Sequence, residues 1–503
     1  MEREIIFGPP GTGKTQTLLQ KVTDVLNEGV RPEEIGYVSF SKKANTEAIF
    51  RAQKIKGFDL NEQDLPYFRT LHSLAFRQLG IDPSTQLMKS ADYNEFANWI
   101  GVIDFETENA FDESGMIISK NQYLNQINLA RYRCISIEEQ YDRNEHNGKV
   151  WWSTLEKIHK GLPEWKKAHH KYDFTDVIEL AVEKKAAPKL KVLFVDEAQD
   201  LNKLQWQYVH ILEQNSEKSF IAGDDDQAIY TFQGADVDHF LELEGKKTIL
   251  TQSYRVPNKV HELAQMVVSR LSKRQPKLWT PRAEDGEVHW VNSLSSIDFK
   301  KGNMLVLASA NYMLEHVKDY LESWGYPYQT RGHRGVAEGF IETLLEWEQW
   351  RNGSELSFES VKRIYANLSV KDKQLRRGFK RCKTLIPDKS YTMDECKKEH
   401  GLLEDRPWAK ALKCDVRTVN YIEAMQRNGE DITKPPRITL STIHAAKGGE
   451  STKVALMQDL SWNAHKSFEN NPDPVHRQFY TGITRTKHTL YVLSPNADNY
   501  YRI

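Results

Sequence analysis

Short apolar runs alternate with segments of helical spacing in the first part of the chain. Glu4 to Phe7 is an apolar run suited to a buried strand, and Thr15 to Leu26 has apolar residues at the spacing of a helix. Ile35 to Phe40 and Pro66 to Ser73 predict two further strands, each leading into another helical segment. This succession is typical of a parallel sheet covered by helices.

The strand pattern is interrupted twice and resumes each time. Residues 79–171 are helical, polar and rich in aromatic residues, and residues 336–436 are helical and strongly charged. The other predicted strands lie at Lys191–Asp200, Ser219–Gly223, Thr248–Thr251, Asn303–Ala308, Arg437–Thr442, Lys453–Gln458 and His488–Leu493. We interpret the strand at Thr248 as the start of a second sheet. The expected fold is α/β, with two parallel-sheet domains that each carry a helical insertion.

Length and charge agree with this division. A chain of 503 residues is too long for one core. The expected limits are 1–78 with 172–246 for the first domain, 79–171 for its insertion, 247–335 with 437–503 for the second domain, and 336–436 for its insertion. The net charge of −1 gives no global basic field, so any contact with nucleic acid must come from a local groove.

The N-terminus and the cysteines narrow the class of protein. Charges in MEREIIFGPPG occupy the place of a signal peptide's apolar core, and no apolar run is long enough to span a bilayer, so we expect an intracellular, cytoplasmic protein. Four scattered cysteines without a C-x-x-C pair argue against disulfides and a zinc ribbon. Cys396 and His400 could share a helix face, but unremarkable residues are the stronger interpretation.

The sequence GPPGTGKT lies between the first strand and the first helix. It fits the phosphate-binding pattern GxxxxGK[ST], whose glycines let backbone N–H groups curl around an anion at the positive end of a helix. Its lysine would reach the terminal phosphates, and its threonine would bind the Mg²⁺ that bridges phosphate oxygens. ATP and Mg²⁺ are therefore the expected cofactors. The predicted binding residues are Gly8, Pro9, Pro10, Gly11, Thr12, Gly13, Lys14 and Thr15.

Two adjacent carboxylates end the apolar strand Val192–Val195. Asp196, at the strand tip, can hold the Mg²⁺ together with Thr15, and Glu197 is free to orient and deprotonate the attacking water. A solvated acidic loop is the alternative, and the phosphate loop upstream disfavours it. After the next strand, Gln227 offers an amide to the terminal phosphate.

Rings and arginines complete the candidate chemistry. Tyr230 and Phe232 follow Gln227, so one loop could touch a nucleotide and a stacked base together, although core packing is nearly as strong an interpretation for Tyr230. The second half has no phosphate loop, and a nucleotide held by the first half would meet its arginines. The stretch Ala409–Ile422 has a helix-turn-helix look with Asp415 as a helix cap, but packing inside the insertion is favoured.

Taken together, these segments resemble the UvrD/Rep/PcrA-type superfamily 1 helicases, in the family's order and across both halves of the chain. The motifs STIHAAKGGE at 441–450 and HRQFYTGITRTK at 476–487 add to the match. The resemblance implies two RecA-like domains, each with a helical insertion, with ATP between them and single-stranded DNA across their tops. Both insertions are short for the family, as in a compact, phage-like member.

The resemblance also implies roles for single residues. The implied catalytic residues are Glu197, Gln227, Arg255 and Arg485, of which Gln227 senses the phosphate and the arginines grip it when the cleft closes. The implied nucleotide contacts outside the phosphate loop are Tyr254 on adenine, Gly448, and Glu450 on ribose. The implied DNA contacts are Phe40, His72, Tyr230, Phe232 and His444, where stacking is worth about 1–3 kcal/mol per base.

Four departures from the family pattern bear on nucleotide specificity and on DNA binding. Seven residues precede Gly8, which leaves no place for the family's adenine-reading glutamine segment, so the preference for ATP over other nucleotides stays open. Gln233 and Ser309 stand where the family commonly has arginine, and Pro474-Val475 replace an acidic pair. We expect part of the DNA grip to be weaker or rearranged.

The leading hypothesis is an ATP-dependent DNA helicase that translocates 3′ to 5′ on single-stranded DNA and unwinds duplexes in replication or repair. The direction follows the family branch that Asp225–Tyr230, Thr442–His444 and Tyr480–Arg485 resemble, although the double proline Pro9-Pro10 is also common in the oppositely directed branch. The expected partners are single strands and single/double-strand junctions, with no membrane contact. We expect a monomeric motor, in the host cytoplasm if phage-encoded.

Other functions stay open. One alternative is a translocase that displaces proteins from single strands without unwinding. Another is a non-enzymatic, helicase-like DNA-binding scaffold, whose expected sign would be the loss of Lys14, Glu197 or an arginine finger, and none is lost. RNA as the substrate is also open, because these residues do not report discrimination of the 2′-hydroxyl.

Overall fold

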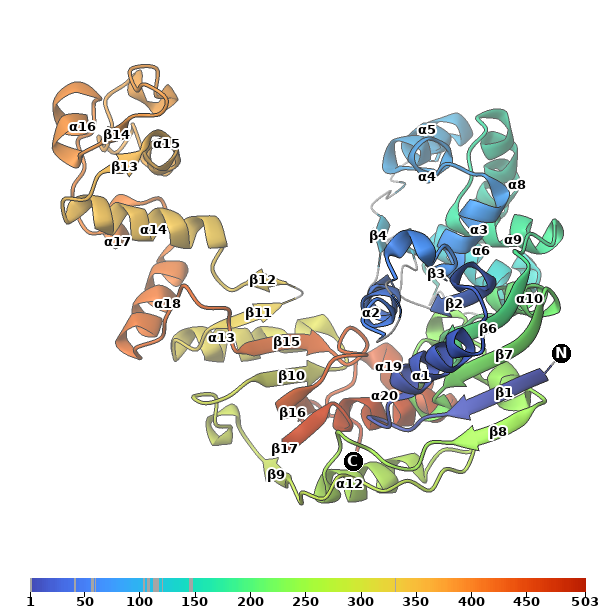
Figure 1. The fold of residues 1–503 in the computed structure, drawn as a ribbon. Coiled ribbons are helices and arrows are strands. Elements are labelled where there is room, and N and C mark those ends of the chain that lie inside the picture. Colours follow the sequence, from blue (N-terminus) through green and yellow to red (C-terminus); the bar gives the residue numbers. More distant parts are fainter. Residues whose placement is uncertain are drawn as a thin grey trace.

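The computed structural model of the chain describes residues 2–39, 42–55, 58, 60–102, 105, 109–111, 117–119, 121–143, 148–330 and 332–503. Two parallel sheets lie side by side, and one inserted segment projects from each (Figure 1). Each strand predicted from the sequence is present, and the α/β fold with two RecA-like sheet domains is confirmed.

The first sheet has six parallel strands in the order β3-β2-β6-β7-β1-β8. Its strands are β1 (Glu2–Phe7), β2 (Ile35–Ser39), β3 (Phe68–Thr70), β6 (Leu190–Asp196), β7 (Ser216–Gly223) and β8 (Lys246–Ile249). One face is covered by α1 (Lys14–Asn27) and α2 (Lys42–Ala52). The other is covered by α3 (Leu71–Leu79), α9 (Phe174–Glu183), α10 (Lys203–Gln214) and α11 (Val237–Glu242). Polar residues that follow the strands therefore gather at one edge.

The strand at Thr248 corrects one expectation. We interpreted it as the start of the second sheet, but β8 pairs in parallel with β1, with Thr248 opposite Ile6 and Ile249 opposite Phe7. The Thr248 hydroxyl also donates a hydrogen bond to Glu4, 3.0 Å away. An apolar run predicts a strand but carries no information about which sheet it joins. The crossover to the second sheet therefore begins after Ile249.

The second sheet has seven strands in the order β12-β11-β15-β10-β16-β17-β9, all parallel except β12. They are β9 (Glu287–Val291), β10 (Met304–Ala308), β11 (Tyr328–Thr330), β12 (His333–Arg334), β15 (Ile438–Thr442), β16 (Ser451–Met457) and β17 (Thr486–Leu493). Helices α12 (Asn258–Val268) and α20 (Asp473–Ile483), flanked by α19 (Trp462–Asn470), pack on one face, and α13 (Glu315–Ser323) packs on the other. The sequence did not predict β9, β11 and β12.

The two inserted segments are attached differently. The first contains α4 (Pro83–Gln86), α5 (Ser90–Ile100), α6 (Gln122–Arg133), α7 (Ile137–Asp142) and α8 (Trp152–Ala168), and it has an apolar core of its own. The second contains α14 (Glu338–Arg351), α15 (Phe358–Ala366), α16 (Met393–Glu399), α17 (Trp408–Ala411) and α18 (Val416–Arg427), and its core is continuous with one face of the second sheet. In Figure 1 the second segment extends as an arm beyond α13.

Both inserted segments were expected to be purely helical, and both also contain a small antiparallel sheet. The first holds β4 (Asn109–Phe111) paired with β5 (Ile117–Ser119), and the second holds β13 (Leu356–Ser357) paired with β14 (Ser390–Tyr391). These strands are two or three residues long, which is too short for a period of two to register in the sequence.

The helix-turn-helix pattern resolves in favour of packing. Asp415 caps α18 by accepting from the Thr418 backbone N–H, as expected, but α17 is a single turn. The Tyr421 hydroxyl of α18 donates to the Tyr326 carbonyl, and the buried side of α18 packs on α13. No described helix is both long and apolar enough to cross a membrane, and all four cysteines are free.

Gly325 generates a prediction about the junction between α13 and α18. Its φ is +65°, and an added Cβ would lie 2.3 Å from the backbone of Ala424. Gly325→Ala should lower the free energy of unfolding by about 1–3 kcal/mol beyond the cost of its left-handed backbone, because backbone cannot yield as a side chain can. Gly429→Ala is the matched control, since Gly429 has φ +70° and open space around it. Equal denaturant midpoints for the two variants would contradict the tight junction.

Candidate functional site: a cleft between the two sheets

The loop between β1 and α1 has the shape of an anion cradle. Gly11 and Gly13 adopt φ of 73° and 81°, which L side chains rarely allow. The Lys14 ammonium donates to the Gly8 carbonyl at 2.9 Å, and the Thr12 hydroxyl donates to the Pro9 carbonyl at 2.8 Å. The loop thus leads directly into the N-terminus of α1, where free backbone N–H groups favour a bound phosphate.

The carboxylates that end β6 lie beside this loop. The Asp196 carboxylate accepts hydrogen bonds from the Thr15 and Tyr37 hydroxyls, both at 2.8 Å. Burial and the neighbouring Glu197 raise the pKa of Asp196. A carboxylate next to a threonine hydroxyl is a set of oxygen ligands that suits Mg²⁺. Thr15 and Asp196, predicted from the sequence as the metal ligands, are therefore brought together.

Glu197 is held in a strained position. Its φ is +54°, a conformation that costs a non-glycine residue about 1–3 kcal/mol and that gathers at functional sites. Burial acts to raise its pKa, but Lys14, Lys447, Arg485 and a hydrogen bond from Gln199 outweigh burial and lower the pKa to about 2. Glu197 is thus an ionised carboxylate next to the phosphate loop, as a general base must be.

The second sheet supplies the other wall of the cleft, which encloses about 540 Å³. Arg255 forms a salt bridge with Glu450, which also pairs with Lys487. Arg485 donates to the Gln227 side-chain oxygen, and burial is the main cause that lowers the pKa of Arg485 to about 9. The predicted catalytic residues Glu197, Gln227, Arg255 and Arg485 therefore line one cleft, from two different sheets.

The segment after β8 joins the phosphate loop to the second half of the chain. The Ser253 hydroxyl donates to the Pro10 carbonyl at 2.7 Å, and the Tyr254 backbone N–H donates to the Gly11 carbonyl at 2.9 Å. The Tyr254 ring is 75% exposed and lines the cleft, together with Gly448. It is available to stack on a planar group in the cleft.

Three of the predicted DNA contacts lie together. The rings of Phe232 and His444 meet edge to face at 5.0 Å between centroids, and the Tyr230 hydroxyl donates to the His444 carbonyl at 3.1 Å. Phe232 is 55% exposed, and it also borders a groove of about 1440 Å³. His72 packs instead against Phe174, and burial lowers its pKa to about 4. Phe40 lies outside the described residues.

Two ionic features of the site were missed in the sequence. Lys447 pairs with Asp200 across the cleft, at 2.6 and 2.5 Å to the two carboxylate oxygens. Burial raises the pKa of Asp200 to about 7, and Lys447 acts against this rise. Lys447 stands in a motif that the sequence singled out, and Asp200 ends the run DEAQD. What the sequence did not give was the pairing, because the two residues are far apart along the chain.

The second missed feature is a buried ionic cluster around Lys277. Its ammonium contacts Asp224, Asp225 and Asp226, and all four side chains are fully buried. Arg274 adds a bond to Asp226 at 2.6 Å. These aspartates immediately precede Gln227, so the cluster fixes the loop that carries this amide. Of this cluster, only Asp225 and Asp226 lie in a stretch that the sequence singled out, and their basic partners were not predicted.

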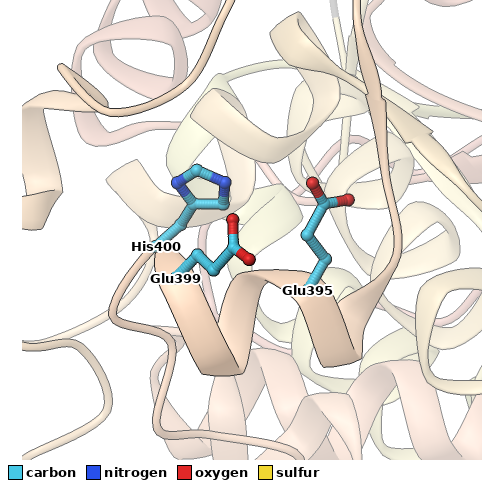
Figure 2. Close-up of side chains that lie close together, drawn as sticks. All are labelled: Glu395, Glu399 and His400. Atoms are coloured by element: carbon cyan, nitrogen blue, oxygen red, sulfur yellow. The ribbon is translucent and has the colours of Figure 1, made fainter.

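A third group of ionisable residues lies away from the cleft, on α16. Glu395, Glu399 and His400 present oxygen and nitrogen atoms within 4.8 Å of one another (Figure 2). Glu395 pairs with Lys389, and the His400 ring bonds the Thr384 hydroxyl at 3.0 Å. These contacts tie the segment 384–389 to α16, and they already occupy two of the three side chains.

Comparison with known proteins finds relatives for both halves of the chain. The model of the UvrD/REP helicase N-terminal domain matches residues 2–248, and that of the UvrD-like helicase C-terminal domain matches residues 396–496, so together they cover more than half of the chain. The ATP-dependent DNA helicases PcrA of Staphylococcus epidermidis and Staphylococcus aureus are each 23% identical over 317 residues, which cover 58% of this chain. The matches span 42% of those relatives' length.

A solved structure, that of the PRRSV helicase, aligns with 99% of this chain and 53% of its own, at 11% identity and a TM-score of 0.35. A likeness of this size carries no argument about fold or function.

Lys277→Met should destabilise the protein strongly, because it leaves three buried carboxylates without their shared cation. Breaking a buried pair costs about 3–5 kcal/mol. Lys273→Met is the control, since the Lys273 side chain is 49% exposed and its pairs with Asp238 and Glu242 should contribute about 1 kcal/mol or less. Chemical denaturation followed by tryptophan fluorescence measures both. A midpoint for Lys277→Met equal to that of the control would mean that the cluster is not held by Lys277.

Proposed function

We propose that this chain, which belongs to the UvrD/Rep/PcrA-type superfamily 1 helicases, hydrolyses ATP in the cleft and uses the energy to move along single-stranded DNA and unwind duplexes. The observation that carries the proposal is that the phosphate loop and Glu197 come from one sheet and Arg255 and Arg485 from the other. A nucleotide between them would link hydrolysis to the relative position of the two sheets.

The proposed domains follow from this division. The first RecA-like domain comprises 1–78 and 172–246, with β8 counted in it to Ile249, and 79–171 forms its insertion. The second comprises the remainder of 247–335 and 437–503, and 336–436 forms its insertion. ATP would lie between the two RecA-like domains, where the cleft is lined from both.

In the proposed reaction, Glu197 orients the attacking water and takes its proton. Lys14 exchanges the Gly8 carbonyl for the terminal phosphates, and Gln227 senses the γ-phosphate. Thr15 and Asp196 would hold the Mg²⁺ that neutralises charge on the phosphate oxygens. The strain at Glu197 supports this role, because it directs the carboxylate to one position.

The two arginines act when the nucleotide arrives. Arg255 bonds Glu450 and Arg485 bonds Gln227 in the structure, so each has a partner from which the γ-phosphate can draw it away. Glu450 then keeps Lys487 as its partner and can bind the ribose, and the exposed Tyr254 ring can stack on the base of the nucleotide. Arginines placed in this way contribute about 10³–10⁵ in rate to phosphoryl transfer.

The strand is proposed to run over Phe232 and His444, where one base can stack on the exposed ring. His72 and Phe40 remain proposed contacts by family likeness. Movement is proposed to be 3′ to 5′ because the motifs that grip the strand are of the UvrD type. A translocase that strips proteins without unwinding remains the second candidate, because the motor parts are the same for both.

Glu197→Gln should lose ATP turnover while it keeps nucleotide and DNA binding, since shape is preserved and the base is removed. The expected fall in kcat is about 10²–10⁴. Steady-state hydrolysis with and without single-stranded DNA measures it, and a fluorescent nucleotide measures binding. Lys14→Ala should instead weaken nucleotide binding. If the wild-type chain hydrolyses no ATP even with single-stranded DNA, the proposed function is wrong. If Glu197→Gln turns over normally, only the base is misassigned.

A duplex with a 3′ single-stranded tail should be unwound in the presence of ATP, and one with a 5′ tail should resist. A tailed duplex with a protein bound to its single-stranded tail distinguishes the helicase from the translocase. Removal of the block without strand separation would favour the translocase. Preference for the 5′ tail would reverse the proposed direction and leave the ATP site untouched.

A further inference from the structure

Lys447 makes a direct polar contact between the turn after β15 and the loops that follow β6 and β7 of the first sheet. An ammonium has three N–H donors, and all three find acceptors across the cleft. They are the two Asp200 oxygens, at 2.6 and 2.5 Å, and the Gln227 carbonyl, at 2.8 Å. The Lys447 side chain is 10% exposed and that of Asp200 is 2% exposed, so water competes little for this contact.

On the side of the first sheet, hydrogen bonds connect Asp200 to Glu197, the proposed general base. Gln199 donates from one amide nitrogen to both Asp200, at 3.1 Å, and Glu197, at 2.5 Å. The Gln199 oxygen accepts from the Asp224 backbone N–H at 2.8 Å, which fixes the orientation of the amide. A change in the position of Asp200 is therefore passed through Gln199 to the carboxylate that activates water.

On the side of the second sheet, the turn that carries Lys447 contacts the residues proposed to bind the DNA strand. The Lys447 backbone N–H donates to the His444 carbonyl at 3.2 Å, and the Tyr230 hydroxyl donates to the same oxygen. The Lys447 ammonium also lies 5.1 Å from the centroid of the Tyr230 ring. His444 in turn meets Phe232 edge to face. A base stacked on Phe232 would thus touch the turn that positions Lys447.

We propose that the Lys447–Asp200 pair is the positioning contact that couples strand binding to hydrolysis, a role that rests on the proposed function of the cleft. A DNA base stacked at Phe232 and His444 fixes the turn after β15. The turn holds Lys447 on Asp200 and on the Gln227 carbonyl. Glu197 and Gln227 are thereby held in the geometry for reaction. In this role Lys447 acts through Asp200 and Gln227 and not on the reacting atoms.

The test is the ratio of kcat with single-stranded oligothymidine to kcat without it. In Lys447→Ala and Asp200→Asn, this ratio should fall at least about tenfold, or about 1.4 kcal/mol. The double variant should lose no more than either single one, because one contact is removed in each case. KM for ATP and the affinity for the strand should stay within about twofold of the wild type, since neither side chain binds them.

Lys453→Ala is the matched control. Lys453 also pairs with an aspartate, Asp298 at 2.6 Å, but both belong to the second half of the chain and lie away from the cleft. Its ratio should equal that of the wild type. Asp200→Asn preserves the shape of the side chain, so it remains informative if Lys447→Ala folds poorly, and circular dichroism checks both.

Three outcomes would overturn the proposal. They are an unchanged ratio in both single variants, an equal fall in Lys453→Ala, and a rise in KM for ATP with the ratio intact, which would make Lys447 a nucleotide contact. A wild-type chain without strand stimulation would instead remove the proposed function itself. The failure of the coupling contact therefore shows only in the variants, and the failure of the function shows already in the wild type.

Discussion

Buried charge is the constraint on which the arrangement of the two sheets depends. Six carboxylates lie at the ends of β6 and β7: Glu197 is half-buried, and Asp196, Asp200, Asp224, Asp225 and Asp226 are buried. Ionised carboxylates in such positions require cations and hydrogen-bond donors, because transfer from water to a low-dielectric site is costly. Of the cations that surround these carboxylates, Lys14 belongs to the first half of the chain. Lys277, Arg274, Lys447 and Arg485 come from the other half of the chain.

This charge distribution makes both walls of the cleft polar and places ion pairs across it. The contact of Lys277 with the three aspartates is fully buried and joins the two halves of the chain. Where Arg255 meets Glu450, the contact is partly exposed and both partners belong to the same half. The Lys277 cluster holds the loop that carries Gln227, and the partly exposed Arg255–Glu450 pair leaves an arginine that a phosphate can bind.

Much of this site could be predicted from the sequence, because strands of a parallel sheet end at one edge and carry their polar residues there. That argument placed Lys14, Thr15, Asp196, Glu197 and Gln227 together, and the structure agrees. It failed for β8, because a four-residue strand has no signal for its partner, and for β9, which has only one buried residue. It also missed Lys277 and Arg274, since isolated basic residues in an irregular segment look like surface.

The first insertion is held to its sheet by ion pairs, and the second by a shared apolar core. These attachments determine which parts of the molecule can move relative to one another. Arg131 of α6 bonds Asp173, Asp176 and Glu179 at the start of α9, so ion pairs anchor the first insertion. Trp347 and Ile364 of the second insertion share one apolar cluster with Val306 of β10.

Each insertion should therefore travel with its own sheet, because neither apolar core nor buried ion pairs separate cheaply. Beside the phosphate loop, the contacts between the two sheets are polar, as in Lys447 with Asp200 and Arg485 with Gln227, whereas the Lys277 cluster joins the two halves through fully buried ion pairs. Any relative motion of the sheets should therefore change the contacts beside the phosphate loop and leave the Lys277 cluster intact.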